Sequence, residues 1–98
     1  MLINLLRNAE QALAGGSDGR IVLAAFLNSR GHVTLEVRDN GPGIDAKILP
    51  RIFVPYFTTK PDGSGIGLAL ARQIVMAHGG SIRASNAEGG GAIFTLTF

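Results

Sequence analysis

The sequence predicts an α+β protein, a two-layer α/β sandwich in which helices cover one face of a mostly antiparallel mixed sheet. Three observations support this fold class: two segments with helical spacing of apolar residues, two pairs of strand-like segments joined by turn residues, and a long irregular middle containing Gly and Pro. The chain has 98 residues, of which 46% are hydrophobic and 16% charged, and this composition fits one globular domain with a modest core.

Two helices are expected, over residues 1–14 and 67–78. Apolar residues recur at helical spacing in both segments. Gly15 and Gly16 end the first, and Gly79 and Gly80 end the second with residues suited to a left-handed cap. In the first helix the residues at this spacing are Leu2, Leu6, Ala9 and Leu13. In the second helix Leu70, Ala71, Ile74 and Val75 are expected to face inward.

Four strands are expected, in two hairpins. Residues 20–27 (RIVLAAFL) are apolar at nearly every position and predict a buried strand, whereas residues 32–39 (HVTLEVRD) alternate between apolar and polar. The turn residues 28–31 (NSRG) join these two segments. Residues 81–85 and 92–98 predict the second hairpin, connected across 86–91.

The middle of the chain, residues 40–64, has no regular period apart from a short helical stretch near 45–52. Such a length is too great for a plain connector, and loops of this kind are usually functional or disordered. Disorder is disfavoured because the segment contains many residues that need burial. They are Ile44, Ile48, Leu49, Ile52, Phe53, Val54, Tyr56 and Phe57. A functional segment is therefore the preferred interpretation.

Composition argues against several classes of protein. The chain has no cysteine, so disulfides and thiolate metal sites are excluded, and a reducing compartment is compatible. Its nine Lys and Arg residues are scattered and the net charge is only +2, which disfavours nucleic acid as a partner. The apolar runs are too short to cross a bilayer and no secretory leader is visible. We expect a cytoplasmic segment that makes no membrane contact.

The first candidate site is one face of the first helix. Asn4, Asn8 and Gln11 share this face, opposite the leucines. Amide oxygens can ligate a hard cation such as Mg²⁺, which takes only one or two protein ligands and completes its shell with water and phosphate. The same pattern also fits a simple solvated face, so this helix alone does not decide the matter.

The second candidate site is DNGPGI, residues 39–44, directly after the alternating strand. The carboxylate of Asp39 can accept a hydrogen bond from the exocyclic amine of adenine. Gly41 and Gly43 lack side chains and would let a flat base approach the backbone. Asp-Asn-Gly after a strand is also a hairpin signal, but residues 45–51 supply no alternating partner strand.

Two further segments can bind anions. The end of RIFVPYFTTK, residues 51–60, presents the hydroxyls of Thr58 and Thr59 and the cation of Lys60, although a single lysine is often merely solvated. GSGIGL, residues 63–68, opens the second helix, where successive backbone N–H groups and the helix N-terminus favour phosphate. It is not a dinucleotide fingerprint, because Leu68 stands where glycine is required, and it lacks the lysine of a P-loop.

Taken together, NLLRNAEQAL, DNGPGI, RIFVPYFTTK and GSGIGLAL resemble the N, G1, F and G2 boxes of sensor histidine kinases. These kinases share an ATPase superfamily with gyrase, a heat-shock chaperone and a mismatch-repair protein. The four boxes occur in order and cover nearly the whole chain. The resemblance implies a Bergerat-type ATP-binding domain over residues 1–98, with ATP and Mg²⁺ as its ligands and phosphoryl transfer as its activity.

The resemblance also implies roles for single residues. Asn8 would ligate Mg²⁺, with Asn4 one turn earlier on the same face and Gln11 where the family often has a basic residue. Asp39 would bind adenine in a pocket shaped by Gly41, Gly43 and Ile44. The remaining expected ATP contacts are Phe57, Thr58, Thr59, Lys60, Gly63, Ser64, Gly65, Ile66, Gly67 and Leu68. Lys60 and the glycine turn would form a lid over the phosphates, with only residues 61–62 between the F and G2 boxes, as in the nitrogen- and oxygen-regulation branch.

The chain departs from the family pattern in two ways. Neither His32 nor His78 has the helical, acid-flanked setting of a phosphoacceptor, so a phosphoacceptor helix domain must come from another segment or chain, with a response regulator downstream. The strand, helix and strand that usually precede the N box are absent, which suggests a truncated domain. We therefore expect self-association through an uncovered sheet edge, either by edge-to-edge strand pairing or by exchange of an element between copies. The alternative is a monomer whose shortened sheet closes over a smaller core. The expected participants are Ile21, Val22, Leu23, Phe26 and the apolar side of the helix over residues 1–13.

Two other functions stay open at this point. One is a serine-phosphorylating relative that acts on a protein of an anti-sigma pathway. The other is a non-catalytic module that keeps the fold and binds a partner in place of nucleotide.

Overall fold

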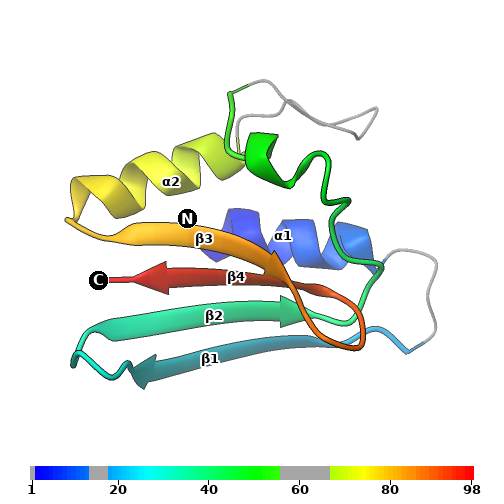
Figure 1. Ribbon diagram of the computed structural model, residues 1–98, viewed down its shortest axis with the longest axis horizontal. Coiled ribbons are helices and arrows are strands. Elements are labelled where there is room, and N and C mark those ends of the chain that lie inside the picture. The colour runs from blue at the N-terminus through cyan, green and yellow to red at the C-terminus, as the bar shows by residue number, and fades with distance from the viewer. Residues whose placement is uncertain (1, 14–17, 56–66) are drawn as a thin grey trace.

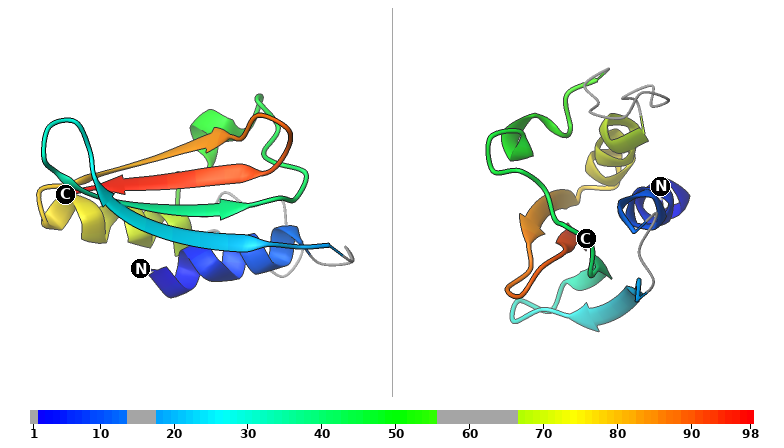
Figure 2. Two further views of the ribbon diagram at one scale, coloured as in Figure 1. Left: turned by 90° about the horizontal axis from the view of Figure 1, so that it is seen from below. Right: turned by 90° about the vertical axis from the view of Figure 1, so that its right-hand side faces the viewer.

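The computed structural model describes residues 2–13, 18–55 and 67–98. Within them, one sheet of four strands carries two helices on a single face (Figures 1 and 2). The elements follow the chain as α1 (Leu2–Ala12), β1 (Ile21–Leu27), β2 (Val33–Asp39), the 3₁₀ turn η1 (Leu49–Arg51), α2 (Gly67–Ala77), β3 (Ser81–Asn86) and β4 (Ala92–Thr97). The two-layer α+β fold is confirmed, and every strand pairing among the described residues is antiparallel.

The strand order is β1-β2-β4-β3, so β2 and β4 are central and β1 and β3 are the edges. Both expected hairpins are present. In the first, Leu23 lies opposite Val37, and the turn is closed by Asn28, whose side-chain Oδ1 accepts hydrogen bonds from the backbone N–H groups of Arg30 and His32. The helical stretch expected near 45–52 is reduced to the single turn η1.

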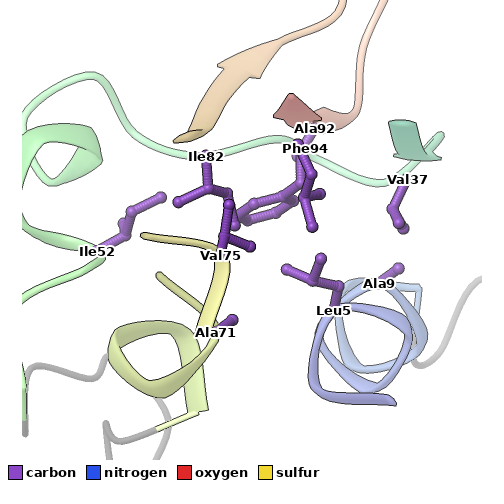
Figure 3. Close-up of a cluster of buried hydrophobic side chains, with 10 residues drawn as sticks. Leu5, Ala9, Val37, Ile52, Ala71, Val75, Ile82, Ala92 and Phe94 are labelled. Carbon is purple, nitrogen blue, oxygen red and sulfur yellow. The ribbon is translucent and has the colours of Figure 1, made fainter. Parts of the chain in front are cut away.

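The core lies between the central strands and the two helices (Figure 3). Leu5 of α1, Val75 of α2 and Leu96 of β4 are fully buried there. Phe53, just after η1, packs edge-on against Phe94 of β4 with ring centroids 6.4 Å apart, which attaches the irregular middle to the sheet. The other buried members are Ala9, Val37, Ile52, Ala71, Ile82 and Ala92.

Two expectations about burial are wrong. Leu70 was expected to face inward, but it is 44% exposed, because Ala71 and Val75, one turn apart, define the buried stripe of α2. The strand β1 was expected to be buried, but its large apolar side chains are exposed, with Leu23 at 51%. The physical reason is its place at an edge: α1 and α2 lie mainly over the other strands (Figure 2).

In the described parts of the chain, neither helix combines the length and the apolar character needed to cross a lipid bilayer.

Candidate functional site

Segments far apart in the sequence, among them the DNGPGI motif, lie at one end of the molecule. The C-terminal ends of α1 and β2, the loop that follows β2 and the turn between β3 and β4 lie together at the right of Figure 1, and α2 begins on the side facing them. Polar residues far apart in the sequence are therefore brought to a common region by the sheet topology.

Asp39, the last residue of β2, is the central polar group of this region. It is only 8% exposed and is one of two buried polar residues in the described chain. Its Oδ1 accepts hydrogen bonds from the backbone N–H of Gly41 at 2.9 Å and from that of Ala92 at 3.3 Å. Both of its hydrogen bonds within the described residues thus end on Oδ1, which leaves Oδ2 able to accept a donor from a ligand.

The loop after Asp39 requires glycine at position 43, and the reason is not only the expected approach of a flat base. Gly43 has a φ of +79°, and a Cβ on it would lie 2.7 Å from Oδ1 of Asn86. Glycine is therefore required here by backbone conformation and by close packing on β3. Gly41 contributes its N–H to Asp39, and its role in opening a base pocket stays a prediction.

Asn40, to which the sequence analysis gave no role, connects the two ends of the first hairpin. Its Oδ1 accepts from the backbone N–H of Arg20 at 2.6 Å, and its Nδ2 donates to the carbonyl of Asp18 at 2.8 Å. This side chain adds to the backbone hydrogen bond from the N–H of Asn40 to the carbonyl of Arg20, so it supports the hairpin where its two ends meet.

Asn86 and Gly91 were also missed. The N–H of Ile44 donates to Oδ1 of Asn86, and Nδ2 of Asn86 donates back to the carbonyl of Ile44, both at 2.7 Å. Gly91 has a φ of +97°, and a Cβ on it would overlap the carbonyl oxygen of Asp39. A polar residue ending β3 and the run of three glycines at 89–91 were the available signals, but neither indicates its distant partner.

The expected metal face on α1 is described in part. Asn8 is half-buried beside the buried Ala9, and Gln11 is exposed. Asn4 belongs to α1, but its side chain lies outside the described part of the structure. Among the described residues, no three His, Cys, Asp or Glu side chains gather as a metal centre.

The expected phosphate-binding segment lies mostly outside the described residues. This applies to Phe57, Thr58, Thr59, Lys60, Gly63, Ser64, Gly65 and Ile66, and to the short lid at residues 61–62. The described part of the motif agrees with the expectation that it opens a helix, since α2 begins at Gly67. Leu68 packs against the core, so its side chain is a structural anchor.

Neither histidine has the position of a phosphoacceptor. His32 is exposed in the β1–β2 turn and its N–H is bonded to Asn28. His78 follows α2, and its Nδ1 donates to the carbonyl of Ile74 at 2.7 Å, which satisfies one of the unpaired carbonyls at the helix C-terminus.

The close approach of Gly91 to Asp39 leads to a prediction with a matched control in the same turn. Gly91→Ala should lower the free energy of unfolding by at least about 3 kcal/mol, because it adds both backbone strain and steric overlap. Gly89, at φ +88°, has no atom within 4 Å of a Cβ. Gly89→Ala should therefore cost only the strain, about 1–2 kcal/mol. Urea denaturation measures both, and equal losses would contradict the proposed contact.

Comparisons with known proteins agree with this geometry. The family model for histidine kinase-, DNA gyrase B- and HSP90-like ATPases matches residues 1–98. The sensor histidine kinase ZraS of Klebsiella oxytoca is 46% identical over 98% of this chain and 20% of its own length. The signal transduction histidine-protein kinase AtoS of Escherichia coli K12 is 43% identical over 98% of this chain and 16% of its own.

Solved structures show the same relationship. The mycobacterial sensor histidine kinase MprB has a TM-score of 0.85 at 30% identity, over 99% of this chain and 68% of its own. Full-length ShkA in complex with AMPPNP has a TM-score of 0.71 at 31% identity, over 96% of this chain and 21% of its own. The chain thus spans about a fifth of the length of ZraS. It belongs to the histidine kinase-, DNA gyrase B- and HSP90-like ATPase family and corresponds to the catalytic ATPase domain of sensor histidine kinases.

Proposed function

We propose that this domain binds Mg²⁺-ATP with the adenine at Asp39 and presents the γ-phosphate to a histidine from another segment or chain of a two-component sensor kinase. The observation that carries the proposal is the buried Asp39 carboxylate, oriented by two backbone donors on Oδ1. An oxygen held in this way is a preorganised acceptor for the exocyclic amine of adenine. ShkA, a similar protein, has been solved in complex with the ATP analogue AMPPNP.

The described residues fit the base end of such a ligand. Ile44 is a half-buried apolar residue in the loop that Asp39 begins, and it packs against the core, so it can bound one side of a pocket for a flat ring. The buried setting of Asp39 excludes most competing water, which strengthens a hydrogen bond to a ligand. Gly41 and Gly43 would complete this pocket.

We assign the metal to the half-buried Asn8 of α1. Its amide oxygen would supply one ligand to Mg²⁺, Asn4 and Gln11 would line the same helix face, and phosphate and water would complete the octahedron. Thr58, Thr59, Lys60 and the turn at residues 63–68 would cover the phosphates, as their hydroxyls, cation and backbone N–H groups suit anions. The short segment at 61–62 would place the chain in the nitrogen-regulation-like branch.

The chemistry that ATP supplies is a transferable γ-phosphoryl group. An imidazole nitrogen from outside this domain would attack the γ-phosphorus as the bond to the β-phosphate oxygen breaks, and ADP leaves. The residues of this domain would orient the nucleotide and neutralise charge, with no covalent role. The phosphoacceptor helix domain, and a response regulator after it, would be the partners. The sensor-kinase identity of the relatives favours this function over an anti-sigma serine kinase or a non-catalytic module.

Replacing Asp39 tests the adenine contact. In Asp39→Asn the side-chain oxygen must face the N–H groups of Gly41 and Ala92, so the amide nitrogen replaces Oδ2 and opposes the adenine amine. ATP affinity should fall at least about tenfold while the fold is retained. Asp45→Asn, an exposed carboxylate in the same loop, is the control. In calorimetry, Asp39→Ala should also lose binding, and comparable wild-type affinity for GTP would contradict the assignment.

The metal assignment has a separate test. Asn8→Ala should reduce the gain in ATP affinity that Mg²⁺ provides, and it should leave binding in the presence of a chelator nearly unchanged, because the adenine contact lies elsewhere. Glu10→Ala, an exposed position on the same helix, is the matched control. ATP titrations with Mg²⁺ and with chelator decide the question. An equal loss under both conditions would show that Asn8 supports only the structure.

We further propose that the chain self-associates through β1. An edge strand is normally protected by charge, proline or a bulge. β3, the opposite edge, has Arg83 and several polar residues, whereas β1 has seven apolar residues and no charge. Val22 and Phe26, at 49% and 43% exposed, lie on one face of β1, and Ile21 and Leu23 lie on the other. Antiparallel pairing with β1 of a second copy, related by a two-fold axis, would engage the unpaired backbone edge and place apolar neighbours beside these side chains on both faces.

Light scattering at micromolar concentration tests this association. The wild-type chain should have about twice the monomer mass of 10.2 kDa. Leu23→Lys should return it to the monomer, because it places a charge on the paired edge, whereas Ser85→Lys on β3 should not. A wild-type monomer that unfolds cooperatively would show that β1 needs no second copy.

A further inference from the structure

We propose that Asn86 is a positioning residue of the nucleotide site, which fixes the loop 39–44 so that Asp39 and Ile44 face the adenine from set positions. This inference rests on the proposed function, because it assigns to Asn86 an effect on adenine recognition. Asn86 is the last residue of β3 and lies 42 positions from Ile44 in the sequence.

The first observation is the geometry of the Asn86 side chain. Its amide accepts from the N–H of Ile44 and donates to the carbonyl of the same residue, both at 2.7 Å. The side chain therefore satisfies both backbone polar groups of Ile44, as a neighbouring strand would do. A residue whose N–H and carbonyl are both engaged cannot rotate its peptide planes without breaking at least one of these bonds. The loop is fixed in orientation as well as in position.

The second observation is that the opposite end of the loop is held by the partner of Asn86. In the β3–β4 ladder Asn86 pairs with Ala92, and the N–H of Ala92 donates to Oδ1 of Asp39. One cross-strand pair thus contacts both ends of the loop, Asp39 through Ala92 and Ile44 through Asn86. The distance between the Asp39 carboxylate and Ile44, the apolar side of the proposed pocket, is consequently set by the distance between two neighbouring strands, β3 and β4.

The third observation is complementarity between Asn86 and Gly43. A Cβ on Gly43 would lie 2.7 Å from Oδ1 of Asn86, so only glycine leaves room for the amide. Gly43 also has a φ of +79°, which directs the chain toward Ile44 in a conformation that other residues rarely adopt. The amide of Asn86 on β3 therefore fits against Gly43, which has no side chain. We call this contact between the loop and the β3–β4 hairpin the joint. Both the loop and the hairpin are needed to build it.

The test compares ATP with purine riboside triphosphate, which lacks the 6-amino group that Asp39 is proposed to bind. In Asn86→Ala, ATP affinity should fall about fivefold to tenfold, as expected for the loss of loop-fixing hydrogen bonds. Affinity for the analogue should fall distinctly less than ATP affinity, because both nucleotides share the ring contact with Ile44 but the analogue makes no contact that depends on the carboxylate. Glu88→Ala, an exposed position in the same turn, should leave both affinities unchanged.

A second variant changes the same contact from the loop. Gly43→Ala should push the Asn86 amide away and lower ATP affinity more than affinity for the analogue, because any narrowing of the base pocket affects both nucleotides alike, so the inference remains testable if Asn86→Ala does not fold. Unchanged ATP affinity in folded Asn86→Ala, or equal losses for both nucleotides, would overturn the inference and leave the proposed function standing. A wild-type chain that binds both nucleotides equally would overturn the adenine assignment, and the inference with it.

Discussion

The hydrogen bonds accepted by Asp39 Oδ1 connect the fold to the site. One donor is the N–H of Gly41 in the loop. The other is the N–H of Ala92, the first residue of β4, which is a central strand that pairs with both β2 and β3. A buried carboxylate is tolerated only when such donors are present. The position of the Asp39 carboxylate therefore depends on the correct pairing of the strands. A ligand that binds this carboxylate would depend on the register of β2, β4 and β3 together.

The elements with a regular period were predicted well because their signal is local. Helices, strands, both hairpins and the position of Asp39 at a strand end all follow from spacing and turn residues within a short window. Burial was less predictable. The apolar sequence of β1 resembles that of a buried strand, and its exposure at the end of the strand order agrees only with the separate expectation, drawn from the family resemblance, of an uncovered sheet edge. Leu70 is exposed for a similar reason, because the packing of α2 against the rest of the fold determines which side of the helix is buried.

The parts of the site that sequence reasoning missed depend on contacts between distant residues. Nothing near Asn86 in the sequence indicates that it pairs with Ile44, and nothing near Gly91 indicates that it meets the carbonyl of Asp39. Both contacts arise because β4 lies between β2 and β3 and brings the β3–β4 turn against the loop. The glycines in DNGPGI were singled out for the approach of a flat base, whereas the close approach that the structure shows at Gly43 is made by a protein side chain, Asn86.

This arrangement has a thermodynamic consequence for ligand binding. A nucleotide that binds only when the loop and the hairpin are joined adds its binding free energy to the stability of that joint. The joint includes the N–H of Ala92, at the start of a strand whose Phe94 and Leu96 belong to the core, so the stabilisation extends from the loop into the sheet. Asn86 is exposed, and its hydrogen bonds exchange with water more readily than those of Asp39. The attachment of the loop at Ile44 is therefore more accessible to water than its attachment at Asp39, and in the proposed function a bound nucleotide would stabilise it.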